Sequence, residues 1–252
     1  MLFRSITTRT WFAERGQLQA NDPLRMARPD AGPYLVSTKA IAVENTHNFG
    51  GGTIQDIKQI RDLHRGATEM GLSLHLDGAR IWNAHIATGV ALTEYGKYFE
   101  TISVCLSKGL GAPIGSVLLS NAENIKTARV WRKRLGAGMR QVGVLGAAGH
   151  FALDNNISRL SEDHRHAKIL AEKIHQVAPT SVYPEFVQSN IVGLNLKETS
   201  LTAADLAIAA KENGVLISAL GPRYARIVTH LDVTESQIHT AAEVIASIMK
   251  GR

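Results

Sequence analysis

Two stretches near the middle of the chain determine the expected fold: Leu72-Ser-Leu-His-Leu-Asp77 and Thr101-Ile-Ser-Val-Cys-Leu106. Each is a short, mainly apolar run of the kind that forms a buried strand. A helix is expected to begin at about Ile81, between the two runs. The second run continues into a glycine-rich loop, Ser107-Lys-Gly-Leu-Gly111. A strand, a helix and a further strand in succession are typical of a parallel sheet covered by helices.

The same alternation extends to both sides of these stretches. Upstream, Lys39–Glu44 is predicted to be a buried strand that ends before Gly50-Gly51-Gly52. Apolar residues then recur at helical spacing from Ile54 to Ala67. Downstream, Ile114–Leu119 is a further strand candidate. Asn121 is a candidate N-cap for a helix that reaches about Leu135. The first 35 or so residues, which contain several turn signals, are predicted to be irregular.

The pattern changes after about Asn156. A long helix is expected over 157–178, and a final helix over 235–249. Shorter strands are expected near 190–195, 215–218 and 226–229. The sequence therefore predicts an α/β fold: a mostly parallel central sheet with helices on both faces in residues 1–156, followed by a smaller C-terminal α+β domain in residues 157–252.

The composition is that of an ordinary globular protein, with 44% hydrophobic and 20% charged residues among 252. No apolar run approaches the roughly 18 residues that span a bilayer, so no membrane partner is expected. The net charge is +6, but the basic residues are dispersed apart from a short cluster at 129–134. A nucleic-acid-binding module is therefore the weakest hypothesis. A single cysteine, Cys105, excludes an internal disulfide and indicates a reducing compartment, the cytoplasm.

The ends of two predicted strands carry residues suited to catalysis. Asp77 closes one strand, and Lys108 follows the other. Ligands of open α/β sheets bind at the carboxyl ends of the strands. A lysine and a carboxylate there suit pyridoxal phosphate, since the amine can bind its aldehyde while the carboxylate keeps the ring nitrogen protonated. Each residue alone has a simpler interpretation: Asp77 as a turn former, Lys108 as an exposed or anion-binding cation.

Other motifs are excluded by their spacing. Gly109–Gly115 is one residue too long for a dinucleotide-binding fingerprint, and no Gly-x-x-x-x-Gly-Lys-Ser/Thr phosphate loop occurs. The histidines lack the spacing of a metalloprotease, so no metal is expected.

Five blocks of sequence resemble, in order, those of the threonine aldolases, which are fold-type-I pyridoxal-phosphate enzymes. The resemblance runs from about residue 14 to the C-terminus. Together the blocks are specific, whereas any one alone is only suggestive. They are His75–Ala84, Ser103–Ser116, Glu44–Asn48 with its triple glycine, Arg132–Gln141 and Arg226–Asp232.

The resemblance implies a role for each matching residue. Lys108 would hold the cofactor covalently, and Asp77 would pair with its pyridine nitrogen. Arg80 would lie near the phenolic oxygen. Arg140, assisted by Lys133, would reach the phosphate from a neighbouring subunit of a homo-oligomer, a dimer or tetramer. Arg226 would bind the substrate carboxylate through its planar guanidinium.

The reaction implied is retro-aldol cleavage of L-threonine or L-allo-threonine to glycine and acetaldehyde. A base must remove the proton of the β-hydroxyl group. His47 is the candidate within the matching blocks, although a structural role is the preferred interpretation of this histidine.

The chain departs from the family pattern at its beginning. Family members carry a Ser-Gly-Thr-like loop for the cofactor phosphate and an aromatic residue that stacks on the ring, and residues 1–13 contain neither. Impaired cofactor binding and turnover are therefore expected. The alternatives are an inactive fragment of the family, or another fold-type-I activity on small amino acids, such as β-elimination or racemisation.

Overall fold

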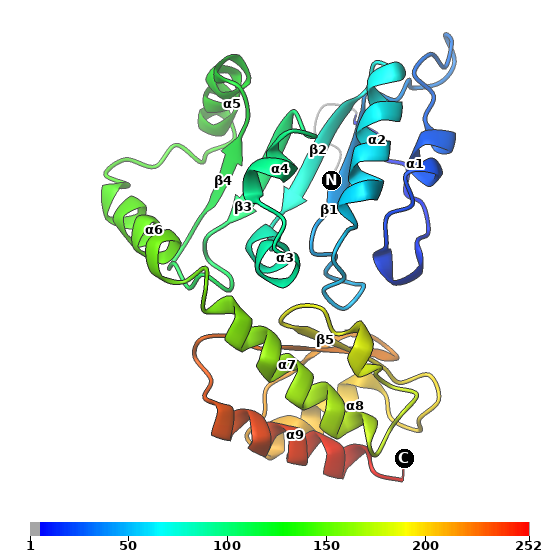
Figure 1. Ribbon diagram of the computed structural model, residues 1–252, viewed down its shortest axis with the longest axis vertical. Coiled ribbons are helices and arrows are strands. Elements are labelled where there is room, and N and C mark those ends of the chain that lie inside the picture. The colour runs from blue at the N-terminus through cyan, green and yellow to red at the C-terminus, as the bar shows by residue number, and fades with distance from the viewer. Residues whose placement is uncertain (1–5, 252) are drawn as a thin grey trace.

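Four strands form the main sheet of the computed structural model, which describes residues 6–251. Their order is β1-β2-β3-β4; the first three run parallel, and the fourth is antiparallel to β3. This sheet lies in the upper part of Figure 1. The strands are β1 (Ala40–Glu44), β2 (Ser73–Gly78), β3 (Thr101–Cys105) and β4 (Ser116–Leu119).

Helices cover one face of this sheet. Leu74 and Leu76 of β2 are fully buried there, together with Ile60 and Leu63 of the amphipathic helix α2. The opposite face carries small or polar residues, and Asp77 on that face is exposed. The helices of this part are α1 (Asn21–Met26), α2 (Ile57–Glu69), α3 (Ile81–Thr88) and α4 (Leu92–Gly96).

A second, antiparallel sheet lies in the C-terminal part of the chain, with the order β5-β7-β6. Helices α7, α8 and α9 pack against it around a separate apolar core that includes Leu170, Leu194 and Ile245. Figure 1 shows this part below the main sheet. Its elements are α7 (Leu160–His175), β5 (Ile191–Asn195), α8 (Ala203–Glu212), β6 (Ser218–Gly221), β7 (Tyr224–Val228) and α9 (Glu235–Met249).

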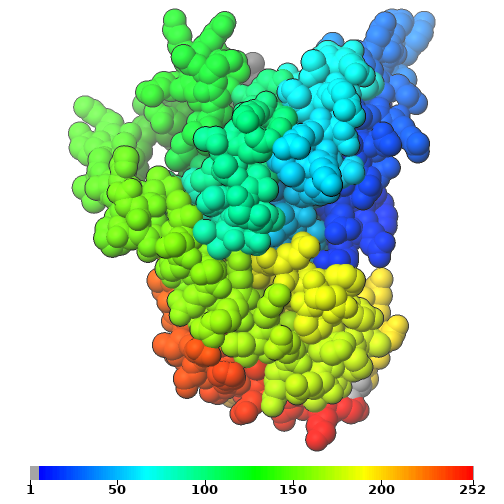
Figure 2. Space-filling model, in the orientation of Figure 1, coloured from blue at the N-terminus to red at the C-terminus, as the bar shows by residue number. Residues whose placement is uncertain are grey.

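Two further helices, α5 (Ala122–Arg134) and α6 (Gly143–Asn155), follow β4. They lie at the edge of the molecule, in green in Figures 1 and 2. Several of their apolar side chains face solvent; Val144 is 81% exposed and Phe151 64% exposed. All residues of β4 are exposed as well. This region therefore presents an exposed apolar surface beside the main sheet.

Most of the predicted elements are present. Asn121 caps α5 as expected, with its side chain accepting from the Asn124 amide, and α9 has the predicted bounds. Four helices of the described residues were not predicted: α1, α4, α6 and α8. Three glycines in α6 lower its helix propensity, so its formation depends on its surroundings. The strand expected at 215–218 begins only at Ser218.

The predicted fold class, a mostly parallel α/β sheet with a smaller α+β part, is confirmed. The apolar side chains form one cluster around the main sheet, one in the C-terminal part, and a small third cluster around Leu110 and Leu160. The domain boundary at 156/157 remains a prediction. No helix among the described residues is long and apolar enough to cross a membrane.

Candidate functional site

The carboxyl ends of the parallel strands bring together the first of the predicted site residues. The pairing register aligns Glu44 of β1 with Asp77 of β2, and Asp77 with Ser103 of β3. Asp77 is exposed, and its Oδ1 accepts from the Ala79 amide at 3.1 Å. This contact is the turn-forming role that an aspartate after a strand usually has. The Asp77 carboxylate forms no other hydrogen bond within residues 6–251 and acts on Arg80 only through its charge, so its second oxygen can meet a ligand.

Lys108 lies in the loop that follows β3, at the same edge of the sheet, and is half-buried. The glycines around it are required by the packing. Gly111 has a φ of +72°, and a Cβ added to Gly109 would come within 2.7 Å of Leu160 Cδ2. The loop therefore packs closely against the start of α7. This contact fixes the position of the backbone from which the Lys108 side chain extends.

Two guanidinium groups meet at a single amide beside this edge. Asn48 Oδ1 accepts from Arg226 Nη1 at 2.7 Å and from Arg80 Nη1 at 3.4 Å. Burial, and then the nearby charge of Arg226, lowers the pKa of Arg80. Arg226 Nε is buried and has no hydrogen-bond partner among the described residues. Two cations held close, with a donor unsatisfied, form a site for an anionic group such as a carboxylate.

The triple glycine brings Asn48 to Arg226. Gly52 O accepts from Ser189 Oγ at 2.9 Å, and Ile54 N donates to Gln188 Oε1 at 2.8 Å. A Cβ at Gly52 would lie 2.2 Å from Ser189 Oγ. The glycine loop thus docks directly on the chain leading into β5, as no bulkier loop could.

His47 is held inside this same turn. Its Nδ1 accepts from the Gly50 amide at 3.0 Å, and its Nε2 lies 3.8 Å from Glu44 Oε2. Its backbone amide donates to Thr53 O at 2.7 Å. These contacts support the structural interpretation of His47, that of a residue that shapes the loop carrying Asn48.

Arg140 lies apart from the other predicted residues. It is exposed, in the connection between α5 and α6, as is Lys133 at the end of α5. Within residues 6–251 no hydrogen bond or ion pair joins either of them to Asp77, Arg80 or Lys108. Of the five predicted residues, Asp77 and Lys108 thus lie at the ends of neighbouring parallel strands, Arg80 and Arg226 share the acceptor Asn48 Oδ1, and Arg140 joins neither pair.

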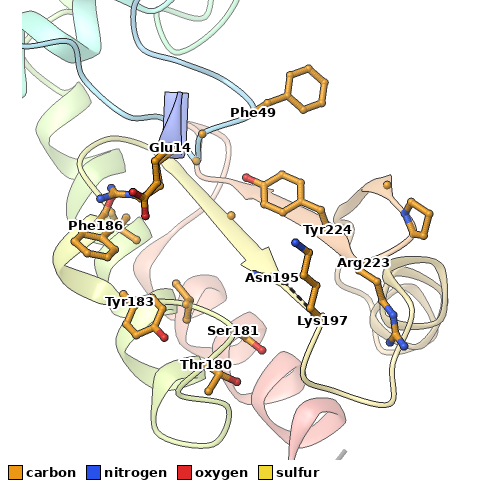
Figure 3. Close-up of a pocket in the computed structure, with 18 residues that line it drawn as sticks. Glu14, Phe49, Thr180, Ser181, Tyr183, Phe186, Asn195, Lys197, Arg223 and Tyr224 are labelled. Atoms are coloured by element: carbon orange, nitrogen blue, oxygen red, sulfur yellow. Dashed lines mark hydrogen bonds between the residues drawn. The ribbon is translucent and has the colours of Figure 1, made fainter. Parts of the chain in front are cut away.

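A cavity of about 780 Å³ opens next to Asn48 and Arg226. Figure 3 shows Tyr224 and Lys197 pointing into it from one wall, with Tyr183 and Phe186 on the other. Neither Asp77 nor Lys108 lines this cavity. A second cavity, of about 920 Å³, lies between residues 6–13 and the open face of β1.

Two residues that touch the predicted site residues were not assigned a role from the sequence. Asn48 accepts from both arginines, and His230 contacts the carbonyl oxygen of Lys108 at 3.0 Å. Asn48 lies in the block Glu44–Asn48 and His230 in the block Arg226–Asp232. Their presence in these two blocks could have marked both as candidate site residues. Among the described residues no group of three or more His, Cys, Asp or Glu side chains could hold a metal ion.

Comparison with known proteins identifies related sequences. The family model described as Beta-eliminating lyase matches residues 2–197. The low-specificity L-threonine aldolase 1 of Arabidopsis thaliana is 40% identical over 212 residues, 84% of this chain and 59% of that protein. The low specificity L-threonine aldolase of Escherichia coli K12 is 40% identical over 213 residues, 84% of this chain and 60% of that protein. The chain thus spans about 60% of the length of these relatives.

Two enzymes are among the solved structures that have a similar fold. The threonine aldolase of Leishmania major has a TM-score of 0.75 at 22% identity, covering 95% of this chain and 70% of its own. The ornithine delta-aminotransferase of Plasmodium falciparum has a TM-score of 0.60 at 14% identity, covering 84% of this chain and 55% of its own. At these identities the likeness concerns the fold alone, and it confirms the predicted fold-type-I class.

Proposed function

The chain belongs to the beta-eliminating lyase family, and from this premise we propose that it is a pyridoxal-phosphate-dependent lyase that cleaves L-threonine or L-allo-threonine to glycine and acetaldehyde. The observation that carries the proposal is the pair of guanidiniums joined by Asn48 beside the strand ends of Asp77 and Lys108. Relatives at 40% identity are named low-specificity L-threonine aldolases, which supports the choice of substrate.

The residues present fit this cofactor. The exposed Asp77 carboxylate would hold the ring nitrogen, the Lys108 amine would hold the aldehyde carbon, and Arg80 would face the phenolic oxygen. Arg80 and Arg226 share the neutral acceptor Asn48, and the unsatisfied Arg226 Nε favours an anion there. When bound, pyridoxal phosphate supplies an electron-accepting ring that stabilises the charge left on Cα as the Cα–Cβ bond breaks.

The protein residues would orient the substrate and keep the proton on the pyridine nitrogen of the cofactor. Arg226 binds the carboxylate through two parallel N–H donors, and Asn48 keeps the guanidinium plane in place. Asp77 keeps a proton on the ring nitrogen, because a carboxylate favours the charged form of its partner. Fixing the carboxylate at one end and Lys108 at the other orients the bond to be broken.

We also propose that the protein forms a homo-oligomer in which residues of a second copy bind the cofactor phosphate. We further propose that it resides in the cytoplasm. Arg140 and Lys133 are exposed beside the apolar surface of β4 and α6, which supports contact with a second copy. The free thiol of Cys105 fits a reducing compartment. Mixing Arg140→Ala chains with Lys108→Ala chains should restore some cofactor binding, because one site of a mixed dimer is intact. Mixed oligomers without any recovery would contradict this arrangement.

The central test is chemical mapping of the lysine. The purified chain is incubated with pyridoxal phosphate, reduced with borohydride and digested. The label is expected on Lys108; a label on Lys97 or Lys133 would overturn the cofactor assignment. Acetaldehyde release from threonine and allo-threonine is then measured, with Lys108→Ala as the control. Arg226→Ala should raise KM about tenfold to a hundredfold while labelling persists, because hydrogen bonds to a charged group are lost. Labelling without aldehyde release would contradict the cleavage reaction.

A further inference from the structure

Side chains from later in the sequence hold the backbone of the lysine loop. The carbonyl oxygens of residues 108–110 each accept a hydrogen bond from such a side chain. The donors are His230 Nε2 to Lys108 at 3.0 Å, Arg159 Nη1 to Gly109 at 3.5 Å and Asn156 Nδ2 to Leu110 at 2.8 Å. Three consecutive side-chain contacts on one loop go beyond ordinary turn formation, because a turn is closed by its own backbone.

His230 makes the contact to the lysine itself. It follows the end of β7 and lies four residues after Arg226. A carbonyl oxygen only accepts, so His230 Nε2 is the donor. On the other side of the ring, Nδ1 lies 2.9 Å from Asp232 Oδ2. The carboxylate also only accepts, so both contacts are hydrogen bonds when both ring nitrogens carry a proton; together they fix the plane of the imidazole with Nε2 pointing at the lysine loop.

Holding the Lys108 oxygen also sets the direction of the Lys108 side chain. The peptide unit is planar, so the position of the oxygen fixes ψ of Lys108 and with it the Cα–Cβ direction. The same oxygen accepts from the Gly111 amide at 2.8 Å. Since Gly109 rests against Leu160, the loop has little room to shift away from His230.

We propose that His230 is a positioning residue for Lys108. It aims the lysine amine at the strand edge that carries Asp77, and it does so from the segment that also carries Arg226. The position of the amine and the binding of a substrate carboxylate are thereby set by one stretch, Tyr224–Asp232. This inference rests on the proposed role of Lys108 as the cofactor lysine.

The first test needs no cofactor. Hydrogen–deuterium exchange is measured over residues 107–112, where the Gly111 and Ala112 amides report on the loop. His230→Phe keeps a ring without the donor and should speed exchange about fivefold, the effect of one lost hydrogen bond. His230→Gln keeps a donor and should restore much of the protection. The control His239→Phe changes a histidine on α9 that makes no contact with the loop, and it should leave exchange unchanged.

The second test follows the lysine. Borohydride trapping with pyridoxal phosphate should label Lys108 about tenfold more slowly in His230→Phe, with rescue in His230→Gln. If His230→Phe does not fold, Asp232→Ala removes an exposed side chain that holds the ring, and it should loosen the loop and slow labelling in the same direction. Unchanged exchange, or a looser loop with unchanged labelling, would overturn the proposal. A wild-type label on another lysine would instead show that the proposed function is wrong.

Discussion

Arg226 and Asn48 are separated by 178 positions in the chain, yet Arg226 Nη1 donates to Asn48 Oδ1 at 2.7 Å. The contact joins β7 of the C-terminal sheet to the loop after β1 of the main sheet. Arg80 reaches the same oxygen from a third segment, at 3.4 Å. The anion site therefore exists only when the two sheets are docked, and one neutral side chain accepts from both of its cations.

Asn48→Asp should disable substrate binding more than Asn48→Ala. The new carboxylate would pair with Arg226 and compete with the substrate carboxylate, whereas alanine removes only the acceptor. We expect KM to rise about tenfold in the alanine variant and about a hundredfold or more in the aspartate variant. Steady-state kinetics on threonine measures both. An aspartate variant with unchanged KM would show that Arg226 does not bind the carboxylate.

Asp77→Asn is the sharpest probe of the ring-nitrogen contact. The asparagine Oδ1 can still accept from the Ala79 amide, so the turn after β2 should be retained. The negative charge is lost, and kcat is expected to fall on the order of 10²–10⁴-fold with Lys108 labelling preserved. Asp77→Ala, which also loses the turn contact, serves as the comparison. Equal and small losses in both variants would assign Asp77 to turn formation alone.

Gly52→Ala should weaken the docking of the two sheets. The added Cβ would lie 2.2 Å from Ser189 Oγ and 3.0 Å from Ile191 Cβ, at a φ of +78°. Gly71→Ala is the matched control, because its φ of +65° is similar but nothing lies within 4 Å. We expect the control to lose about 1 kcal/mol of unfolding free energy, and Gly52→Ala a further 1–3 kcal/mol or so. Urea unfolding measures the difference, and equal losses would refute the docking role.

His164 should make stability depend on pH. Burial lowers its pKa from 6.5 to about 4, and Asn83 Nδ2 lies 3.1 Å from its Nε2, as a donor to the neutral ring would. Above pH 6.5 the ring is neutral whether the chain is folded or not. As the pH falls from 6.5 to about 4, the unfolded chain gains a proton that the folded chain resists, so stability decreases. The loss is on the order of 3 kcal/mol at most.

His164→Gln removes this titration while keeping a polar side chain near Asn83. Its unfolding free energy should vary less between pH 6.5 and 4 than that of the wild type. The His239→Phe variant, with a change on the exposed face of α9, provides the comparison. Parallel pH profiles for His164→Gln and the wild type would contradict the assignment.

The sequence by itself determined most of the strands and long helices and the identity of the reactive groups. Apolar residues two apart in β2 and at helical spacing in α2 required a sheet with a covering helix, because these periods place them on one face. Asn121 started α5 through its own side chain, which accepts from the Asn124 amide. Asp77 and Lys108 were found because each follows a strand of a predicted parallel sheet, where strand ends converge.

Only the tertiary structure decided which side chains meet across the two sheets. The contacts of Asn48 with Arg226 and of His230 with Lys108 join residues more than 100 positions apart. The periodicity of apolar residues cannot predict such a pair, because the contact depends on the conformation of irregular loops and on how they pack against each other. Helix α6 likewise formed against the propensity of its glycines. Local sequence fixes backbone torsions, whereas long-range contacts arise from the sum of many weak packing energies over the whole fold.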